Sequence, residues 1–298
     1  MQELTTEETA VAVREAIDKV EPFSLIRLGD GEAIILGYPE FYSPERLLHQ
    51  LRRWFGEHAK EPKQFTALRP LLESAIRDAD ILGTHFAEVD AEKARAWLLR
   101  PCDVTQQEKE FTAQMSYGLL PHLTKPLLSH QKICSKVVHL TLLTGGFLNN
   151  LLMNLQRVTV ITCNDVSEVL HSINSTLRLR HIHVPGQAIR EGDRLAEWQR
   201  FDPHFPVVCD RVLNQVKGGD YDSPVLVGAG PLGKVYCDEV KRSGGVGIDI
   251  GSVLDVWAGR ITRAYMETDR FRAKMRALAA QSRLWASGSP LRLKSQDT

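Results

Sequence analysis

The stretch Phe23-Ser-Leu-Ile-Arg-Leu-Gly-Asp-Gly-Glu32 predicts a β-strand that leads directly into a pair of carboxylates flanked by glycines. Its first six residues are mainly apolar, and successive side chains of a strand point to opposite faces. Gly29 and Gly31 permit a tight turn and a close approach of the backbone to a ligand. We therefore expect a strand at 23–28 whose carboxyl end carries a functional turn.

Asp30 and Glu32 are the candidate metal ligands of this turn. An Asp-x-Glu pair suits Mg²⁺ or Mn²⁺, which take one or two protein carboxylates and keep positions for substrate phosphates. Arg27, on the same strand, either pairs with a phosphate or is a buried partner of Asp30. The alternative for the acidic pair is a polar turn that binds nothing.

A second glycine-rich stretch, Gly228-Ala-Gly-Pro-Leu-Gly-Lys234, lies between a predicted strand and a predicted helix. Gly228, Gly230 and the helix N-terminus would accept the negative charge of a diphosphate, and Lys234 would add a point charge. Asp249 ends the next predicted strand and is a candidate general base, with a ribose contact and a helix cap as alternatives. Both stretches are thus expected at one edge of the sheet.

The same loop also fits the GxGxxG pattern of dinucleotide-binding folds, with Asp249 in the place of a ribose-binding acid. This makes an NAD(P)-dependent oxidoreductase the main alternative, followed by a non-catalytic nucleotide-binding protein. Pro231 argues against the dinucleotide, because it removes one amide that would face a pyrophosphate.

Together, the motifs in Arg27–Glu32, Val227–Lys234 and Gly247–Gly251 resemble the GT-D type glycosyltransferases, bacterial enzymes that transfer sugars from nucleotide-sugar donors. The likeness spans about 23–257 and includes the strand ending at Pro185. It implies a UDP-linked donor, a glycan or glycoconjugate acceptor in polysaccharide biosynthesis, and a divalent ion that neutralises the leaving diphosphate. The chain departs from the family pattern after Asp-x-Gly, where Ser252 stands in place of a histidine.

Composition is typical of a globular protein, with 43% apolar and 25% charged residues among 298. A net charge of zero gives no general attraction to nucleic acid, and we expect none as a partner. The sequence has no apolar run as long as a membrane span, and its first residues are unlike a signal peptide. Five scattered cysteines without a CxxC pair favour free thiols and a cytoplasmic protein.

Alternating strands and helices predict an α/β, Rossmann-like, mostly parallel sheet with helices on both faces, a helical insertion after the first strand and a helical C-terminal tail. The expected strands are 23–28, 81–86, 158–163, 179–184, 224–228 and 246–250. The expected helices are 5–20, 43–55, 66–79, 91–99, 105–120, 166–173 and 207–216. We place one domain at 1–259 and a tail at 260–298.

The tail carries nine Lys or Arg against three Asp or Glu, and 266–285 predicts a basic amphipathic helix. Its apolar side carries Phe271, Met275, Leu278 and Trp285. Such a side packs on its own domain, on a second copy in a homodimer, or on a membrane surface near a lipid-linked acceptor.

Overall fold

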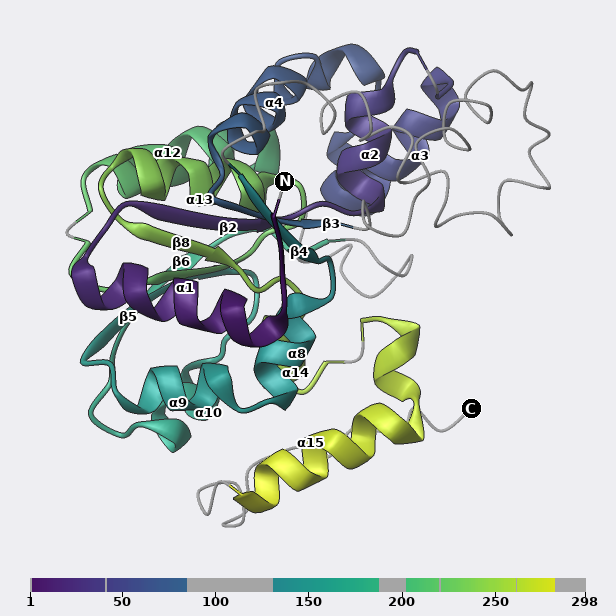
Figure 1. Ribbon diagram of the computed structural model, residues 1–298. Coiled ribbons are helices and arrows are strands. Elements are labelled where there is room, and N and C mark those ends of the chain that lie inside the picture. Colours follow the sequence, from purple (N-terminus) through teal and green to yellow (C-terminus); the bar gives the residue numbers. More distant parts are fainter. Residues whose placement is uncertain are drawn as a thin grey trace.

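The computed structural model describes residues 2–40, 42–84, 131–187, 202–219, 221–260 and 262–281. Within them, eight parallel strands form one sheet in the order β1-β4-β3-β2-β8-β7-β5-β6 (Figure 1). The strands are β1 (Gln2–Leu4), β2 (Phe23–Arg27), β3 (Ile81–Thr84), β4 (Lys132–Ser135), β5 (Arg157–Thr162), β6 (Arg178–His183), β7 (Val225–Gly228) and β8 (Val246–Asp249). The predicted Rossmann-like α/β fold is confirmed.

Helices cover both faces of the sheet, and each face has its own apolar core (Figure 1). The first face carries α2 (Asp30–Gly37), α3 (Pro44–Phe55), α4 (Leu68–Asp78), α12 (Cys209–Lys217) and α13 (Leu232–Arg242), with the short turns η1 (Gly56–His58), η2 (Pro62–Phe65) and η5 (His204–Val208). The second face carries α1 (Thr6–Lys19), α8 (Val138–Thr144), α9 (Phe147–Met153), α10 (Ser167–Ile173), α14 (Val253–Trp257) and α15 (Asp269–Gln281).

The direction of each crossover explains which face its helix covers. Connections that step toward β6, such as β1 to β2 and β5 to β6, carry their helices on the second face. Connections that step toward β1, such as β2 to β3 and β7 to β8, carry theirs on the first face. A constant hand of crossover between parallel strands produces this rule.

This arrangement opens a crevice at the carboxyl ends of β2 and β8, which are neighbours in the sheet. The chain leaves β2 toward α2 on the first face and leaves β8 toward α14 on the second face. Ligands of open parallel sheets bind where neighbouring strands send their connections to opposite faces. Both predicted motifs therefore lie at the edge where a ligand is expected.

The sequence correctly predicted the N-terminal caps of two helices. Thr5 caps α1 in a reciprocal capping box with Glu8, and Ser43 caps α3 with Pro44 in its first turn. Strands β1 and β4 and helices α8 and α9 were not predicted, because each is too short to show a recognisable repeat of apolar residues. The predicted helices 91–99 and 105–120 lie outside the described residues.

The turn expected after β2 is instead helical, since α2 begins at Asp30. Glu32 supports this helix start by accepting a hydrogen bond from the Gly29 amide at 2.8 Å. The acidic pair thus belongs to the first helical turn, where a carboxylate is favoured by the helix dipole. The expected turn is therefore the first turn of a helix, and its role in binding a ligand stays a prediction.

The C-terminal segment packs on its own domain as far as the structure describes it. After η6 (Ala264–Glu267), helix α15 begins at Asp269 rather than at 266. Met266 and Met275 are buried in the core of the second face, and Phe271 packs against that core. None of the described helices is both long and apolar enough to cross a membrane.

Candidate functional site

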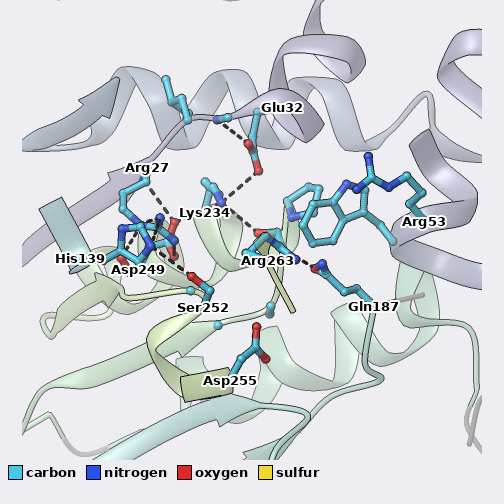
Figure 2. Close-up of a pocket in the computed structure, with 18 of the residues that line it drawn as sticks. Arg27, Glu32, Arg53, His139, Gln187, Lys234, Asp249, Ser252, Asp255 and Arg263 are labelled. Carbon is cyan, nitrogen blue, oxygen red and sulfur yellow. Dashed lines mark hydrogen bonds and ion pairs between the residues drawn. The ribbon is translucent and has the colours of Figure 1, made fainter. Parts of the chain in front are cut away.

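A cavity of about 500 Å³ opens at the carboxyl ends of the central strands (Figure 2). Its lining contains most of the residues singled out from the sequence, namely Arg27, Gly29, Glu32, Gly228, Gly230, Pro231, Lys234 and Asp249. Gly31 is buried beside it in α2, and the side chain of Asp30 is not among those the structure describes. The fold therefore joins the two motifs in one place, while their assignment to catalysis, nucleotide and metal stays a prediction.

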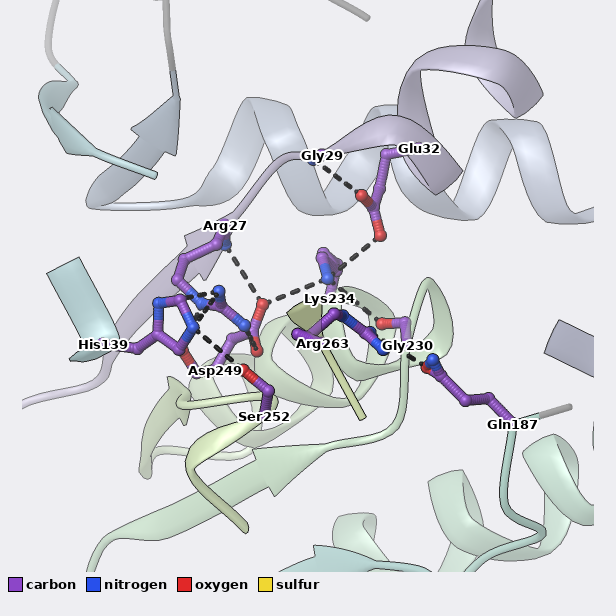
Figure 3. A network of polar contacts seen from close by, with 10 residues as sticks. All are labelled: Arg27, Gly29, Glu32, His139, Gln187, Gly230, Lys234, Asp249, Ser252 and Arg263. Atoms are coloured by element: carbon purple, nitrogen blue, oxygen red, sulfur yellow. Dashed lines mark hydrogen bonds and ion pairs between the residues drawn. The ribbon is translucent and has the colours of Figure 1, made fainter. Parts of the chain in front are cut away.

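Four charged side chains at the cavity floor form what we call the buried ion-pair network: Arg27, Glu32, Lys234 and Asp249 (Figure 3). Asp249 is its centre and is only 2% exposed. Its carboxylate accepts from Arg27 Nη2 at 2.9 Å, from the Arg27 amide at 3.2 Å and from Lys234 Nζ at 3.1 Å. The network thus connects β2, β8 and α13.

The environment of Asp249 makes it a poor proton acceptor. Burial alone would raise its pKa, but the charges of Arg27 and Lys234 outweigh burial and lower the pKa to about 2. A general base works best when its pKa is near the working pH. The contacts therefore favour an anchoring role for Asp249 over the base or ribose contact expected from the sequence.

Lys234 has no donor left for a phosphate in this arrangement. Its ammonium lies 3.0 Å from Glu32 Oε1, 3.1 Å from Asp249 Oδ2 and 3.1 Å from the Gly230 carbonyl oxygen. An ammonium offers three N–H groups, and these contacts use all of them. Despite the cost of burial, the two carboxylates raise the pKa of Lys234, so it stays charged. Its described contacts make it an internal counter-ion.

His139, which the sequence analysis did not single out, joins the network from α8. Its ring accepts a hydrogen bond from Arg27 Nη1 and lies 3.2 Å from Ser252 Oγ through Nε2. Burial, followed by the nearby charge of Arg27, lowers the pKa of His139 well below its usual value. His139 is therefore neutral at neutral pH, and a ring nitrogen can accept the hydrogen bond that Arg27 Nη1 donates.

Trp54 of α3 separates the two glycine motifs. A Cβ added to Gly230 would come within 2.3 Å of Trp54 Cε3, and one added to Gly31 would come within 2.8 Å of Trp54 Nε1. Gly230 also has a φ of 57°, which favours glycine. The indole ring thus occupies the space that a side chain at either glycine would fill.

The glycine of the Asp-x-Gly element, Gly251, is also required by its surroundings. Gly251 has a φ of 46°, and a Cβ there would lie 2.0 Å from Arg27 Nη2. The guanidinium therefore occupies the space that a side chain at 251 would fill. This close approach lets Arg27 reach the carbonyl oxygen of Asp249, which accepts from Arg27 Nε at 3.0 Å.

Partly exposed basic side chains line the cavity above the network, and we call Arg53, Lys136 and Arg263 the basic rim. Arg263 donates to the Thr262 carbonyl at 2.8 Å and to Gln187 Oε1 at 3.2 Å (Figure 3). Sequence reasoning missed the rim because its members lie in segments without a recognisable motif. For Arg263, the excess of Lys and Arg after 260 was the available signal.

No cluster of three or more His, Cys, Asp or Glu side chains suited to a metal ion occurs among the described residues. Glu32, one of the two predicted ligands, is already held by the Gly29 amide and the Lys234 ammonium. A metal ion at Glu32 would have to displace Lys234. The described residues thus do not form a prepared divalent-ion site.

Comparison with known proteins identifies the family. No curated protein matches this sequence. A solved structure described as the selenomethionine-substituted domain of unknown function 1792 is similar at 13% identity and a TM-score of 0.49, over 85% of this chain and 79% of its own. That likeness is too distant to support an argument. The family model of the GT-D fold-like domain, however, matches residues 4–257, which include both motifs and most of the cavity. This chain therefore belongs to the GT-D-like family and is a glycosyltransferase-like protein.

Proposed function

We propose that this protein transfers a sugar from a nucleotide-sugar donor to a glycan or glycoconjugate acceptor, with UDP-sugars as the first donors to test. Polysaccharide biosynthesis is the process that such a reaction would serve. The proposal rests on family membership together with the charge of the cavity.

The charge of the cavity is the observation that carries the proposal. The chain as a whole has a formal net charge of zero. The described lining of the cavity nevertheless contains five basic side chains, Arg27, Arg53, Lys136, Lys234 and Arg263, against three carboxylates, Glu32, Asp249 and Asp255. A concave site with an excess of one charge concentrates ligands of the opposite charge. A nucleoside diphosphate is such a ligand.

The dimensions and location of the cavity agree with this ligand class. Its volume of about 500 Å³ falls within the range of roughly 300–1,000 Å³ that is usual for small-molecule sites. It lies at the carboxyl ends of parallel strands, where nucleotides bind in open α/β sheets.

The transfer forms a bond between the acceptor hydroxyl oxygen and the anomeric carbon of the donor sugar. The bond from that carbon to the diphosphate breaks, and a nucleoside diphosphate and the hydroxyl proton are released. Negative charge develops on the departing diphosphate, so fixed positive groups near it lower the barrier. In this chain Arg263 of the basic rim is suited to that role, since its described partners are neutral oxygens while the cations of the network are paired with carboxylates.

A divalent ion at Asp30 and Glu32 remains a separate prediction. Glu32 would have to exchange Lys234 for the ion, and the side chain of Asp30 is not described. We therefore assign no step of the transfer to a metal ion. The experiment below measures metal dependence directly.

An NAD(P)-dependent enzyme is less consistent with the geometry. The acid that would bind the ribose, Asp249, is 2% exposed and is held by Arg27 and Lys234. Trp54 fills the space that a side chain at Gly230 would occupy, which narrows the approach of a dinucleotide to this glycine. The acid is thus not open to a ribose as the fingerprint requires.

Thermal shift against UDP-, GDP-, CMP- and dTDP-sugars and NAD(P) tests the proposal, each with Mn²⁺ and with a chelator. A true donor at one hundred times its dissociation constant should add about 2.7 kcal/mol of apparent stability. Stabilisation by a sugar nucleotide, followed by release of its nucleoside diphosphate when a glycan acceptor is added, would support the transfer. Stabilisation by NAD(P) alone, or by no nucleotide, would overturn it.

Comparing donor stabilisation with Mn²⁺ and with chelator tests the divalent ion separately. Donor stabilisation that is equal with Mn²⁺ and with chelator would show that donor binding needs no divalent ion. Stabilisation that requires Mn²⁺ and is lost in Glu32→Gln would support a divalent ion at Glu32.

A further inference from the structure

We infer that Arg263, which lies beyond the family domain, is a ligand of the donor diphosphate. This inference rests on the proposed function and names one residue of the same site. It assigns a binding role to the segment that follows the domain, which from its sequence was expected only to pack on a surface.

Arg263 differs from the cations of the buried ion-pair network in its partners. Arg27 and Lys234 each contact at least one carboxylate within 3.1 Å. Among the described residues, Arg263 contacts only neutral oxygens, one on Thr262 and one on Gln187. A guanidinium carries five N–H donors in a planar fork, so most of them remain available.

The remaining donors of Arg263 suit a diphosphate better than they suit water alone. Planar guanidinium groups bind pairs of phosphate oxygens through two parallel hydrogen bonds. Arg263 lines the cavity, and its charge contributes to the lowered pKa of buried His139 at the cavity floor. Its positive field therefore extends into the space where a donor would lie.

The segment that carries Arg263 is anchored on both sides. Thr262 Oγ1 donates to Asp255 Oδ2 at 2.6 Å, and the Arg260 amide donates to the Asp255 carbonyl at 2.8 Å. On the other side, Met266 is 2% exposed in the core of the second face. Arg263 is thus held in place before a ligand arrives, which reduces the entropy lost on binding.

Gln187 provides the second support, from the segment that follows β6. Its Oε1 accepts from Arg263 Nη2 at 3.2 Å, so it orients the guanidinium without neutralising it (Figure 3). A carboxylate in this place would pair with Arg263 and weaken its attraction for a phosphate. A neutral amide is the expected partner of an arginine that binds an anionic ligand.

Arg263 lies outside the part of the chain that the family model matches. The family model ends at residue 257, and Arg263 lies six residues later. Among the described residues after 260, Arg270 lies on an exposed turn of α15, whereas Arg263 lines the cavity. Arg263 is therefore the one of these two that is placed to contact a donor.

Binding of UDP, inorganic pyrophosphate and uridine to Arg263→Gln, measured by calorimetry, tests this assignment. We expect the dissociation constants of UDP and of pyrophosphate to rise tenfold or more, which corresponds to about 1.4 kcal/mol. Uridine, which has no phosphate, should bind the variant and the parent protein equally. Arg263→Lys should recover part of the loss, because the charge remains while the planar fork is absent.

Arg270→Gln is the matched control, since it removes the same charge from the same segment at an exposed position. Equal affinity of Arg263→Gln and Arg270→Gln for both phosphate ligands would overturn the inference, as would a loss of uridine binding as large as the loss of UDP binding. If pyrophosphate binding depends on Arg263 but no sugar nucleotide binds, the diphosphate site stands and the proposed transfer fails. If sugar nucleotides bind equally well to Arg263→Gln and to the parent protein, the proposed function stands and the role of Arg263 in diphosphate binding is overturned.

Discussion

The buried ion-pair network and the basic rim both contain Arg and Lys side chains, but Arg263 of the rim has different partners from the cations of the network. In the network, Asp249 is 2% exposed and bound by Arg27 and Lys234, and Lys234 is 5% exposed between two carboxylates. On the rim, Arg263 is partly exposed and contacts neutral oxygens. One group is internally neutralised, while Arg263 remains open to an external anion.

This contrast shows that a conspicuous motif residue is not always the one available to a ligand. Buried charges are stable only when they are paired, so Arg27, Lys234 and Asp249 are committed to one another. Exposed charges lose little by being unpaired, since water solvates them. The motifs therefore form the floor that shapes the cavity, and Arg263, which lies outside them, offers the open charge.

Breaking the network should produce the largest effect on stability. Asp249→Asn leaves Arg27 and Lys234 without their shared charge, and loss of one partner of a buried pair costs about 3–5 kcal/mol. Urea unfolding followed by circular dichroism measures this change. Asp202→Asn, which removes the partner of Arg211 in an exposed pair, is the control and should cost less than about 1 kcal/mol. Equal losses in the two variants would mean that the network has no special role in the fold.

Lowering the pH should weaken the same network, with a somewhat smaller effect on the free energy of unfolding than Asp249→Asn has. The folded-state pKa of Asp249, about 2, lies below the value of about 3.9 expected for an unfolded chain. Its ionised form therefore stabilises the fold above about pH 4, and this contribution is lost as the pH falls from 4 to 2. The difference in free energy of unfolding between the parent protein and Asp249→Asn should narrow by about 2 kcal/mol over that interval. A gap that stays constant in urea titrations at pH 4 and pH 2 would contradict the shift.

A change at Thr262, the residue before Arg263 of the basic rim, should have the smallest effect on stability. Thr262→Val keeps the shape of the side chain but removes the hydrogen bond to Asp255 Oδ2. Asp255 keeps the hydrogen bond from Asn164 Nδ2, so we expect a loss of about 1–2 kcal/mol in urea unfolding. Because Thr262 adjoins Arg263, UDP affinity should fall as well. Unchanged UDP affinity despite the stability loss would show that Arg263 does not depend on this anchor.

Strong local patterns made much of the fold predictable from the sequence. Apolar strands such as 158–163 and 246–250, and capped helices at Thr5 and Ser43, are signalled by neighbouring residues alone. Elements such as β1 and β4 were missed because three or four residues carry too little periodicity to be recognised. These short strands exist because neighbouring strands supply their hydrogen bonds.

The sequence by itself determined that this is an α/β protein with two glycine-and-acid motifs at strand ends, since strand period, helix caps and glycine spacing are local properties. Only the tertiary structure decided what those motifs contact. It put Lys234 between Glu32 and Asp249 and brought His139 to Arg27 from another helix. It also placed Arg263 at the cavity with neutral oxygens as its partners among the described residues. The physical reason is that a charged side chain is assigned its partner by burial and distance, and both arise only when segments far apart in the chain pack together.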